Sequence, residues 1–185
     1  ESNEFAIMAP KSYMTADQRF VTKREDVLSW TTPPLTEDLT VCGEVQALIN
    51  FATNMGDADI YVKLIDVYPD DRSPLDTDLD EVDYQGYERV IRIGYIRGRY
   101  RESYVSGIPF EANKKTAVKV PLLEVFHTFE KDHRIMIQVQ SSMFPLFDMN
   151  PQQYIEDFYQ ATKEDFKPSV HRVYNDSKII LPIKK

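Results

Sequence analysis

The fold is decided by the stretch VCGEVQALINF at residues 41–51. Its alternate residues are small or apolar, and these are Val41, Gly43, Val45, Ala47, Ile49 and Phe51. A period of two is typical of a strand with one buried face and one solvated face. The stretch therefore predicts a half-buried β-strand.

The rest of the chain predicts further short strands. Residues 60–68 place Ile60, Val62 and Leu64 on one face. Other runs rich in β-branched or aromatic residues lie at 87–101, 117–123, 134–141, 170–174 and 179–182. Short helical pieces are expected at 16–20, 24–27 and 151–159. The expected core contains Ile49, Phe51, Ile60, Val62, Leu64, Ile135, Ile137 and Val139.

The composition agrees with an all-β fold. The chain has 185 residues with 10 Phe, 11 Tyr, 11 Pro and 6 Gly, which suits strands joined by irregular connections. No linker rich in Gly, Ser or Pro divides it, and no internal repeat occurs. We therefore expect one domain over residues 1–185, folded as an antiparallel β-sandwich.

Charge and cysteine content exclude several classes of protein. Lys and Arg total 22 against 30 Asp and Glu, a net charge of -8 that argues against a nucleic-acid partner. No run approaches the roughly 18 apolar residues of a membrane span. The single cysteine, Cys42, excludes an internal disulfide framework. Its place on a predicted strand, with no adjacent base, predicts a buried and inert thiol.

Two segments are read from composition alone. Residues 70–86 are rich in Asp and predict an exposed loop, where weak calcium binding stays open. The chain begins at Glu1 without the pattern of a secretory signal. We expect either a cleaved signal peptide or a piece of a longer protein.

Motifs for catalysis and for cofactors are missing from the sequence. Gly94 and Gly98 are the only glycines four apart, and the residues between them include no serine, so a nucleophile elbow is excluded. Phosphate-binding glycine loops are also missing, and we expect no catalytic residue and no cofactor. His127, His133 and His171 have no second His or Cys at metal-ligand spacing. Strand-end histidines bonded to backbone are the favoured interpretation.

Charged residues at two places predict an internal ion-pair network. Asp57 and Asp59 could be paired acids or calcium ligands, but carboxylates paired with backbone amides or arginines are the favoured interpretation. Arg97, Arg99 and Arg101 alternate along a predicted strand, which would place three guanidinium groups on one face. Given the net negative charge, we expect the three arginines to form internal ion pairs with acids such as Asp57, Asp59 or Asp66.

A cluster of large apolar residues follows the strand at 134–141. It includes Phe144, Phe147, Tyr154, Phe158 and Tyr159, close to Pro145 and Pro151. Such a cluster can be a carbohydrate platform, but it more often packs a loop across the edge of a sandwich.

Three segments, in order, carry a family resemblance. They are DADIYVKLIDVYPD at 57–70, IRGRYRESY at 96–104 and HRIMIQVQSSMFPLFDMNPQ at 133–152. Together they resemble the C-terminal domain of the X-Pro dipeptidyl-peptidase type of hydrolases. The likeness is closest to α-amino-acid ester hydrolases and glutaryl-7-aminocephalosporanic acid acylases, and more distant to cocaine esterase. Two departures are Asp132, where the family usually has Gly, and Met149, where a basic residue is usual.

The resemblance implies both a fold and a context. The fold is a jelly-roll β-sandwich of the galactose-binding-like type, attached to an α/β-hydrolase domain of the same polypeptide. The serine, histidine and aspartate of catalysis would lie upstream, so none is assigned here. The resemblance also implies a periplasmic or secreted location and the formation of homo-oligomers.

The sequence therefore leaves two alternative hypotheses for the function. The first is a non-catalytic domain that packs on a serine hydrolase domain and helps to form its active-site wall and an oligomer interface. The second is an independent carbohydrate-binding jelly roll. The candidate domain interface consists of Met143, Phe144, Pro145, Leu146, Phe147, Tyr154, Phe158 and Tyr159, although these residues could instead close the end of the sandwich.

Overall fold

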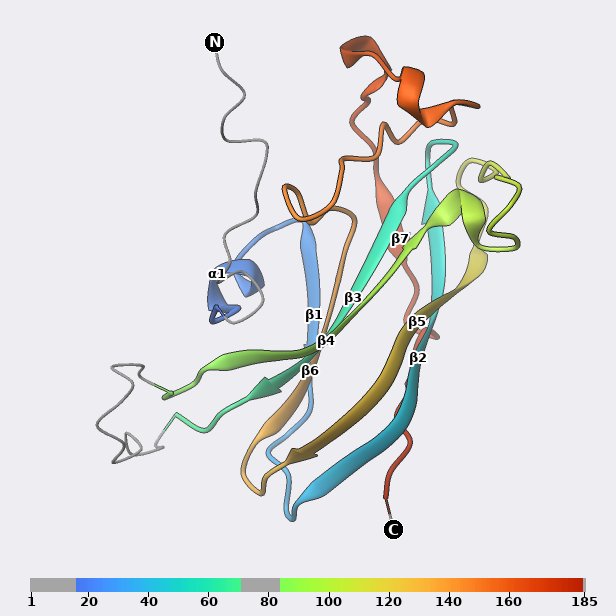
Figure 1. Cartoon of the computed structure of the whole chain (residues 1–185). Helices are drawn as coiled ribbons and strands as arrows, with labels where there is room; N and C mark the ends of the chain where they lie inside the picture. Colours follow the sequence, from blue (N-terminus) through green and yellow to red (C-terminus); the bar gives the residue numbers. More distant parts are fainter. Residues whose placement is uncertain (1–15, 71–83, 185) are drawn as a thin grey trace.

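The computed structural model describes residues 16–70 and 84–184 of the chain (Figure 1). The described strands are β1 (Val27–Thr31), β2 (Leu39–Thr53), β3 (Asp59–Val67), β4 (Glu88–Arg97), β5 (Thr116–Phe129), β6 (Arg134–Gln140), β7 (His171–Val173) and β8 (Lys178–Ile180). One short helix, α1 (Arg19–Thr22), precedes them, and three single 3-10 turns interrupt the later loops. The prediction of an all-β sandwich is confirmed.

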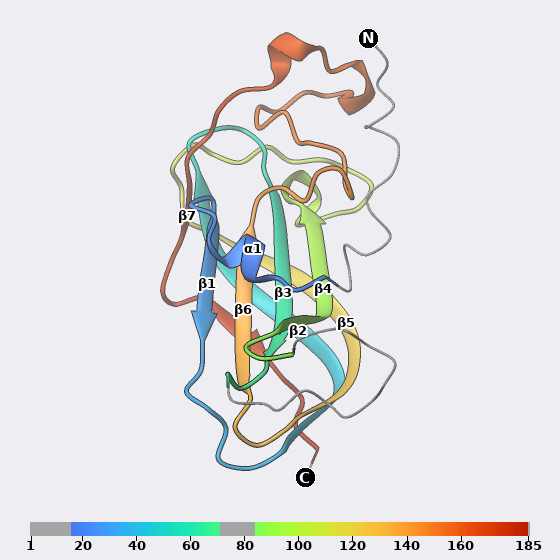
Figure 2. The same cartoon turned by 90° about the vertical axis from the view of Figure 1, so that its left-hand side faces the viewer.

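The strands form two antiparallel sheets that pack face to face (Figures 1 and 2). The first sheet has the order β1-β6-β3-β4, and the second has the order β5-β2-β7 with β8 also paired to β2. The pairs β1–β6, β2–β5 and β3–β4 are nested, as in one long hairpin whose arms are folded over together. This nesting is the connectivity of a jelly roll.

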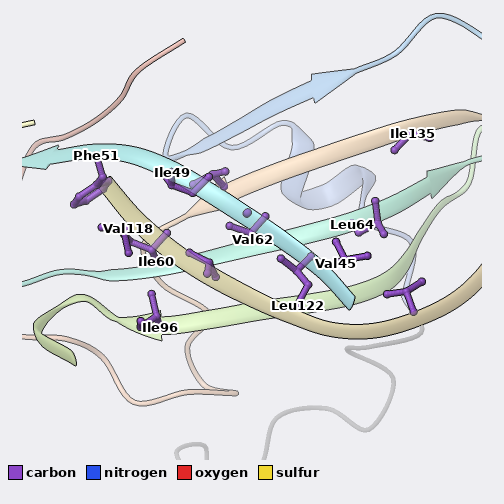
Figure 3. Packing of buried hydrophobic residues seen from close by; sticks show 14 of the residues in the cluster. Val45, Ile49, Phe51, Ile60, Val62, Leu64, Ile96, Val118, Leu122 and Ile135 are labelled. Atoms are coloured by element: carbon purple, nitrogen blue, oxygen red, sulfur yellow. The ribbon is translucent and has the colours of Figure 1, made fainter. Parts of the chain in front are cut away.

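The core lies between the two sheets (Figure 3). The strand predicted at 41–51 extends over 39–53, and its apolar phase points at the facing sheet. Of the expected core residues, seven are buried, and these are Ile49, Phe51, Ile60, Val62, Leu64, Ile135 and Val139. Ile137 is only half-buried. It lies opposite Trp30 of the edge strand β1 and lines a groove that the second sheet leaves open.

Strand β3 is buried on both faces. Its inner face holds Val62 and Leu64, while Tyr61 and Lys63 point outward and are equally buried. Helix α1 lies against this outer face (Figure 2), and its Val21 is buried there. Lys63 Nζ donates a hydrogen bond to Gln18 Oε1 at 2.8 Å, just before the helix. Both faces of the first sheet are therefore covered at its centre.

Three local predictions are wrong. The strand expected to reach residue 101 ends at Arg97, and a 3-10 turn spans Gly98–Tyr100. No α-helix occupies 151–159, where bends lead into the 3-10 turn Phe158–Gln160. Cys42 is exposed, because it lies on the face of β2 that points away from the core. Most of the predicted acidic loop, residues 71–83, lies outside the described residues.

Gly98 explains why the strand stops. Its N–H bonds to the carbonyl of Ala58 at 2.7 Å, and the ring of Phe110 packs directly over it. A Cβ at this position would lie 2.4 Å from Phe110 Cε2 and 2.7 Å from the Ala58 oxygen. The chain turns here because glycine alone permits this approach.

Candidate functional site

Most of the predicted site residues gather at one end of the sandwich, the upper end in Figure 1. The beginning of β3 and the end of β4 meet there. The loops over 98–115 and 141–170 cover them. We call this region the loop end.

The first ion pair of the loop end joins Asp59 to Arg97. Arg97 Nε and Nη2 donate to the two Asp59 oxygens at 3.1 and 3.2 Å, a bidentate contact across paired positions of β3 and β4. Asn150 Nδ2 donates to the same carboxylate at 2.7 Å. Burial raises the pKa of Asp59, and Arg97 and Asn150 oppose that effect. The carboxylate thereby links the sheet to the loop that contains Asn150.

The second ion pair, between Asp57 and Arg99, is deeper. Arg99 Nε lies 2.7 Å from Asp57 Oδ2, and the two side chains are 2% and 0% exposed. The other Asp57 oxygen accepts from the Ala58 amide at 2.9 Å. Arg99 Nη1 donates to the carbonyl of Ile155 at 2.6 Å. Like the first pair, it reaches from the sheet to the 150–159 loop.

The arginines also stack on aromatic rings. Arg97 lies 3.9 Å from the ring centre of Phe158, and Arg99 lies 4.6 Å from that of Tyr154. Each guanidinium therefore contacts a carboxylate at or just before the start of β3 and an aromatic ring of the loop, and both contacts are favourable.

Arg101 has a different role from the one the alternation predicts. Arg101 does not lie on β4 and does not join the ion pairs of Arg97 and Arg99, because the turn at Gly98 changes the direction of the chain. Its Nη atoms donate to the carbonyls of Gly98, Ile108 and Pro109, and its guanidinium lies 4.3 Å from the Phe110 ring centre. Burial lowers its pKa. The prediction of three guanidinium groups on one strand face is wrong.

The candidate interface residues divide between packing and exposure. Met143 is buried, while Pro145, Leu146, Phe147, Tyr154 and Phe158 are half-buried. Tyr154 is fixed by a hydrogen bond from its hydroxyl to the Gly107 carbonyl at 3.0 Å. Phe144 and Tyr159 point into solvent, and Tyr159 is 92% exposed. Met149 is also exposed.

An aromatic cleft of about 420 Å³ lies beside the ion pairs. It is lined by Tyr95, Ile96, Arg97, Tyr100, Tyr104, Phe147 and Asp148. Phe147 packs on Tyr95 and on Tyr61, with ring centres 4.8 and 5.1 Å apart. Burial raises the pKa of Tyr95 to about 12. Sequence reasoning missed the three cleft tyrosines, although three tyrosines within residues 95–104 were a usable signal.

The histidines make side-chain contacts that the sequence did not predict. His127 Nε2 and His133 Nδ1 contact the two oxygens of buried Asp66 at 2.9 and 2.8 Å. The expected backbone partners are wrong for this pair, and Asp66, expected as a possible partner of the arginines, contacts these histidines instead. His171 Nε2 lies 2.9 Å from Ser169 Oγ, and burial lowers the His171 pKa to about 4. Within the described ranges, no group of three or more His, Cys, Asp or Glu side chains is arranged to hold a metal ion.

Chemically, the loop end holds a loop in place. The buried guanidinium groups of Arg97 and Arg99 are paired with carboxylates of the same chain. Their charge therefore stabilises the loop and is not directed at a ligand. At the surface, this end exposes Phe144, Tyr159 and the open side of the cleft, together with charged residues such as Asp148 and Glu156. The fold and this site define a jelly-roll domain whose aromatic-rich end is anchored by buried ion pairs.

Comparison with known proteins identifies the family. Residues 1–179 match the model of the X-Pro dipeptidyl-peptidase C-terminal non-catalytic domain. The chain belongs to this family. Cocaine esterase from Rhodococcus sp. (strain MB1 Bresler) is 33% identical over 177 residues, which cover 92% of this chain and 28% of the esterase.

Solved structures agree with this assignment. An α-amino acid ester hydrolase matches with a TM-score of 0.84 and 40% identity, over 91% of this chain and 27% of that one. An aminopeptidase from the marine sediment archaeon Thaumarchaeota archaeon matches with a TM-score of 0.84 and 38% identity, over 92% and 28%. The chain thus spans little more than a quarter of the length of these relatives. Among the residues the structure describes, no helix is long and apolar enough to cross a membrane.

Proposed function

We propose that this non-catalytic domain packs, through its loop end, against the α/β-hydrolase domain of a longer polypeptide. There it forms one wall of the active site. The observation that carries the proposal is the combination of an exposed aromatic surface with a buried anchor. Tyr159 and Phe144 are exposed, while the loop that bears Tyr159 is fixed by the Asp57–Arg99 and Asp59–Arg97 pairs.

Rigidity is useful only if the loop must present its side chains in one arrangement. A solvated loop gains nothing from a buried ion pair, whose desolvation costs several kcal/mol per ion unless geometry and further hydrogen bonds repay it. Preorganised aromatic residues, by contrast, dock at low entropic cost. Anchored aromatics at a surface therefore support a contact with another protein domain.

In the proposed parent enzyme, the catalytic groups belong to the other domain. A serine would attack the acyl carbon of an ester or amide, a histidine would transfer the proton, and water would release the acyl group. The jelly roll contributes shape to this site and no reacting group. Formation of homo-oligomers by the parent enzyme stays a prediction that rests on the family resemblance alone.

Hydrogen exchange tests the docking surface directly. We expect the amides of residues 143–159 to exchange more slowly when the hydrolase domain is linked to the chain than in the isolated chain. The turn at 130–133, at the opposite end of the sandwich, is the internal control and should not change. Equal exchange of residues 143–159 in both forms would contradict the proposal.

A second candidate function is carbohydrate binding. The aromatic cleft favours it, because tyrosine rings beside a carboxylate can stack on a sugar and accept its hydroxyl groups. Titration of the isolated chain with a panel of oligosaccharides, followed by calorimetry, tests this function. Binding that is lost in Tyr104→Ala and kept in Tyr159→Ala would support it over domain docking.

A further inference from the structure

A groove runs along the open side of the sandwich, between β1 of the first sheet and β7 and β8 of the second. Two pockets of about 320 and 200 Å³ form it, and they share Val139 and Val173. Phe51 and Ile60 line the larger pocket, so the groove reaches the core. Both edges lie on the left in Figure 2. The aromatic cleft shares no lining residue with this groove, although the larger pocket also touches the loop end at Asp59, Ser141 and Ser169.

The groove is apolar because β1 extends beyond the second sheet. Leu28 is paired with Val139 and Trp30 with Ile137, so both side chains lie on the core face of their sheet. They are nevertheless 43% and 49% exposed. Two large core-facing side chains are thus left without a covering strand in the described part of the chain.

The backbone of β1 is also open on this side. The Thr32 amide donates to the Ile135 carbonyl at 3.0 Å, which sets the phase of the antiparallel ladder with β6. Leu28 and Trp30 therefore bond to β6, while the N–H and C=O groups of Ser29 and Thr31 point outward. Within the described ranges β1 pairs with β6 alone.

This edge has little of the usual protection against pairing. Proteins shield free strand edges with very short strands, Lys, Pro, bulges or covering segments, and of these β1 has only its short length of five residues. The β1 sequence, VLSWT, contains neither Lys nor Pro, and its pairing with β6 is continuous. An open apolar edge of this kind is suited to β-augmentation, in which an extended segment adds a strand to the sheet.

We propose that the β1 edge binds an extended segment of the same longer polypeptide, from outside residues 1–185, as a fifth strand of the first sheet. Its backbone pairs with Ser29 and Thr31, and alternate apolar side chains enter the two pockets. The pockets are at or below the roughly 300–1,000 Å³ typical of small-molecule sites, which favours peptide side chains. The proposal rests on the proposed attachment to a hydrolase domain.

Charge and chain length favour this occupant. Glu25 and Asp26 lie at the larger pocket, and Lys178 lies at the smaller one. Asp26 is paired with Arg24, so Glu25 supplies the net negative charge of that end. A segment with a basic residue toward Glu25 and an acidic residue toward Lys178 would complement these charges. Relatives with more than three times this length have ample chain to supply it.

Exchange at the β1 edge, in the longer polypeptide, tests the inference. We expect the outward amides of Ser29 and Thr31 to exchange at least about tenfold more slowly there than in the isolated chain. Ser29→Pro removes an outward N–H that the ladder with β6 does not use, so the isolated variant should melt like the parent. In the longer polypeptide it should return Thr31 to the exchange rate of the isolated chain. Ser29→Ala, the matched control, should keep the protection.

The outcomes separate this inference from the proposed function. Protection of 143–159 without protection of Ser29 and Thr31 overturns the β1 proposal and leaves the loop-end proposal intact. Protection of neither overturns both. Protection of Ser29 and Thr31 that increases with the concentration of the isolated chain would assign the edge to a second copy, and would overturn the proposal as well.

Discussion

Arg99 and Asp57 form an almost fully buried ion pair, with Nε and Oδ2 2.7 Å apart. The pair connects the start of β3 to a loop nearly a hundred residues later, because Arg99 also bonds to the Ile155 carbonyl. Such a charge pair is weak evidence for stability, since hydrophobic replacements are often equally stable. Breaking one partner, however, leaves an uncompensated buried charge.

Asp57→Ala should therefore destabilise the chain strongly, by about 3–5 kcal/mol. The physical reason is the isolated Arg99 guanidinium, which has no access to water. Urea denaturation of the isolated chain measures the loss. Glu111→Ala, which breaks the exposed pair with Lys114, is the control and should change the unfolding free energy by less than about 1 kcal/mol. Similar urea midpoints for the two variants would contradict the buried-pair argument.

Sequence reasoning predicted this network by residue type, and the structure supplies the pairing. Acidic residues before a strand and arginines at the end of another indicated ion pairs. They did not indicate which arginine takes which acid, because the turn at Gly98 changes the direction of Arg99 and Arg101. That turn depends on Phe110 and Ala58, which are distant in sequence. A pattern of period two cannot report a contact of this kind.

Gly98→Ala tests the cause of the turn. The added Cβ would lie 2.4 Å from Phe110 and 2.7 Å from the Ala58 oxygen. The Ala58 oxygen belongs to the backbone, so it cannot move away without distorting the chain. We expect the unfolding free energy to fall by about 3 kcal/mol, the upper end of the usual cost of overpacking. Gly107→Ala is the matched control, since its nearest neighbour is the Tyr154 hydroxyl at 3.2 Å. Equal unfolding midpoints for both variants would show that Gly98 is not required.

The remaining differences from the sequence-based predictions have the same origin. Alternation correctly placed Ile137 on the core face, but it could not show that the second sheet stops short of this position. Asp66 was expected to pair with an arginine, but the sequence could not show its actual partners, because His127 and His133 lie 61 and 67 residues away. Local patterns report faces of strands, whereas coverage and partners depend on the packed sheets.

Lys63 predicts a dependence of stability on alkaline pH. Burial lowers its pKa to about 8, and repulsion by Arg24 acts in the same direction while Glu88 opposes it. The unfolded chain, with a pKa of 10.5, binds more protons between pH 8 and 10.5. The Lys63 contribution to the unfolding free energy therefore increases as pH rises through this window. Below pH 8 both states are protonated, and the contribution is constant.

Lys63→Met should remove that contribution, because methionine does not titrate. The measurement is the difference in unfolding free energy between parent and variant at several values from pH 7 to 10.5, which cancels the effect of the tyrosines. We expect the difference to shift in favour of the parent above pH 8. Lys119→Met, at an exposed position on β5, is the control and should give no such shift. Parallel pH profiles for Lys63→Met and the parent would contradict the lowered pKa.

Asp132 adopts a left-handed backbone conformation that glycine favours. Its φ is 68°, in the tight turn between β5 and β6, and its amide bonds to the Leu35 carbonyl at 2.9 Å. The turn therefore keeps its geometry with an aspartate in it. A left-handed conformation costs an L-residue roughly 1–2 kcal/mol, and less for aspartate, whereas glycine adopts it freely.

Asp132→Gly should consequently stabilise the chain, by about 0.5–1 kcal/mol after the greater freedom of glycine in the unfolded state is subtracted. Asp132→Val should do the opposite, because a β-branched side chain is least compatible with positive φ. The side chain is exposed, so neither change disturbs the core. The order of urea midpoints is expected to be Gly, then Asp, then Val. A midpoint for Asp132→Gly below that of the parent would mean that the carboxylate stabilises the turn by more than the left-handed backbone costs.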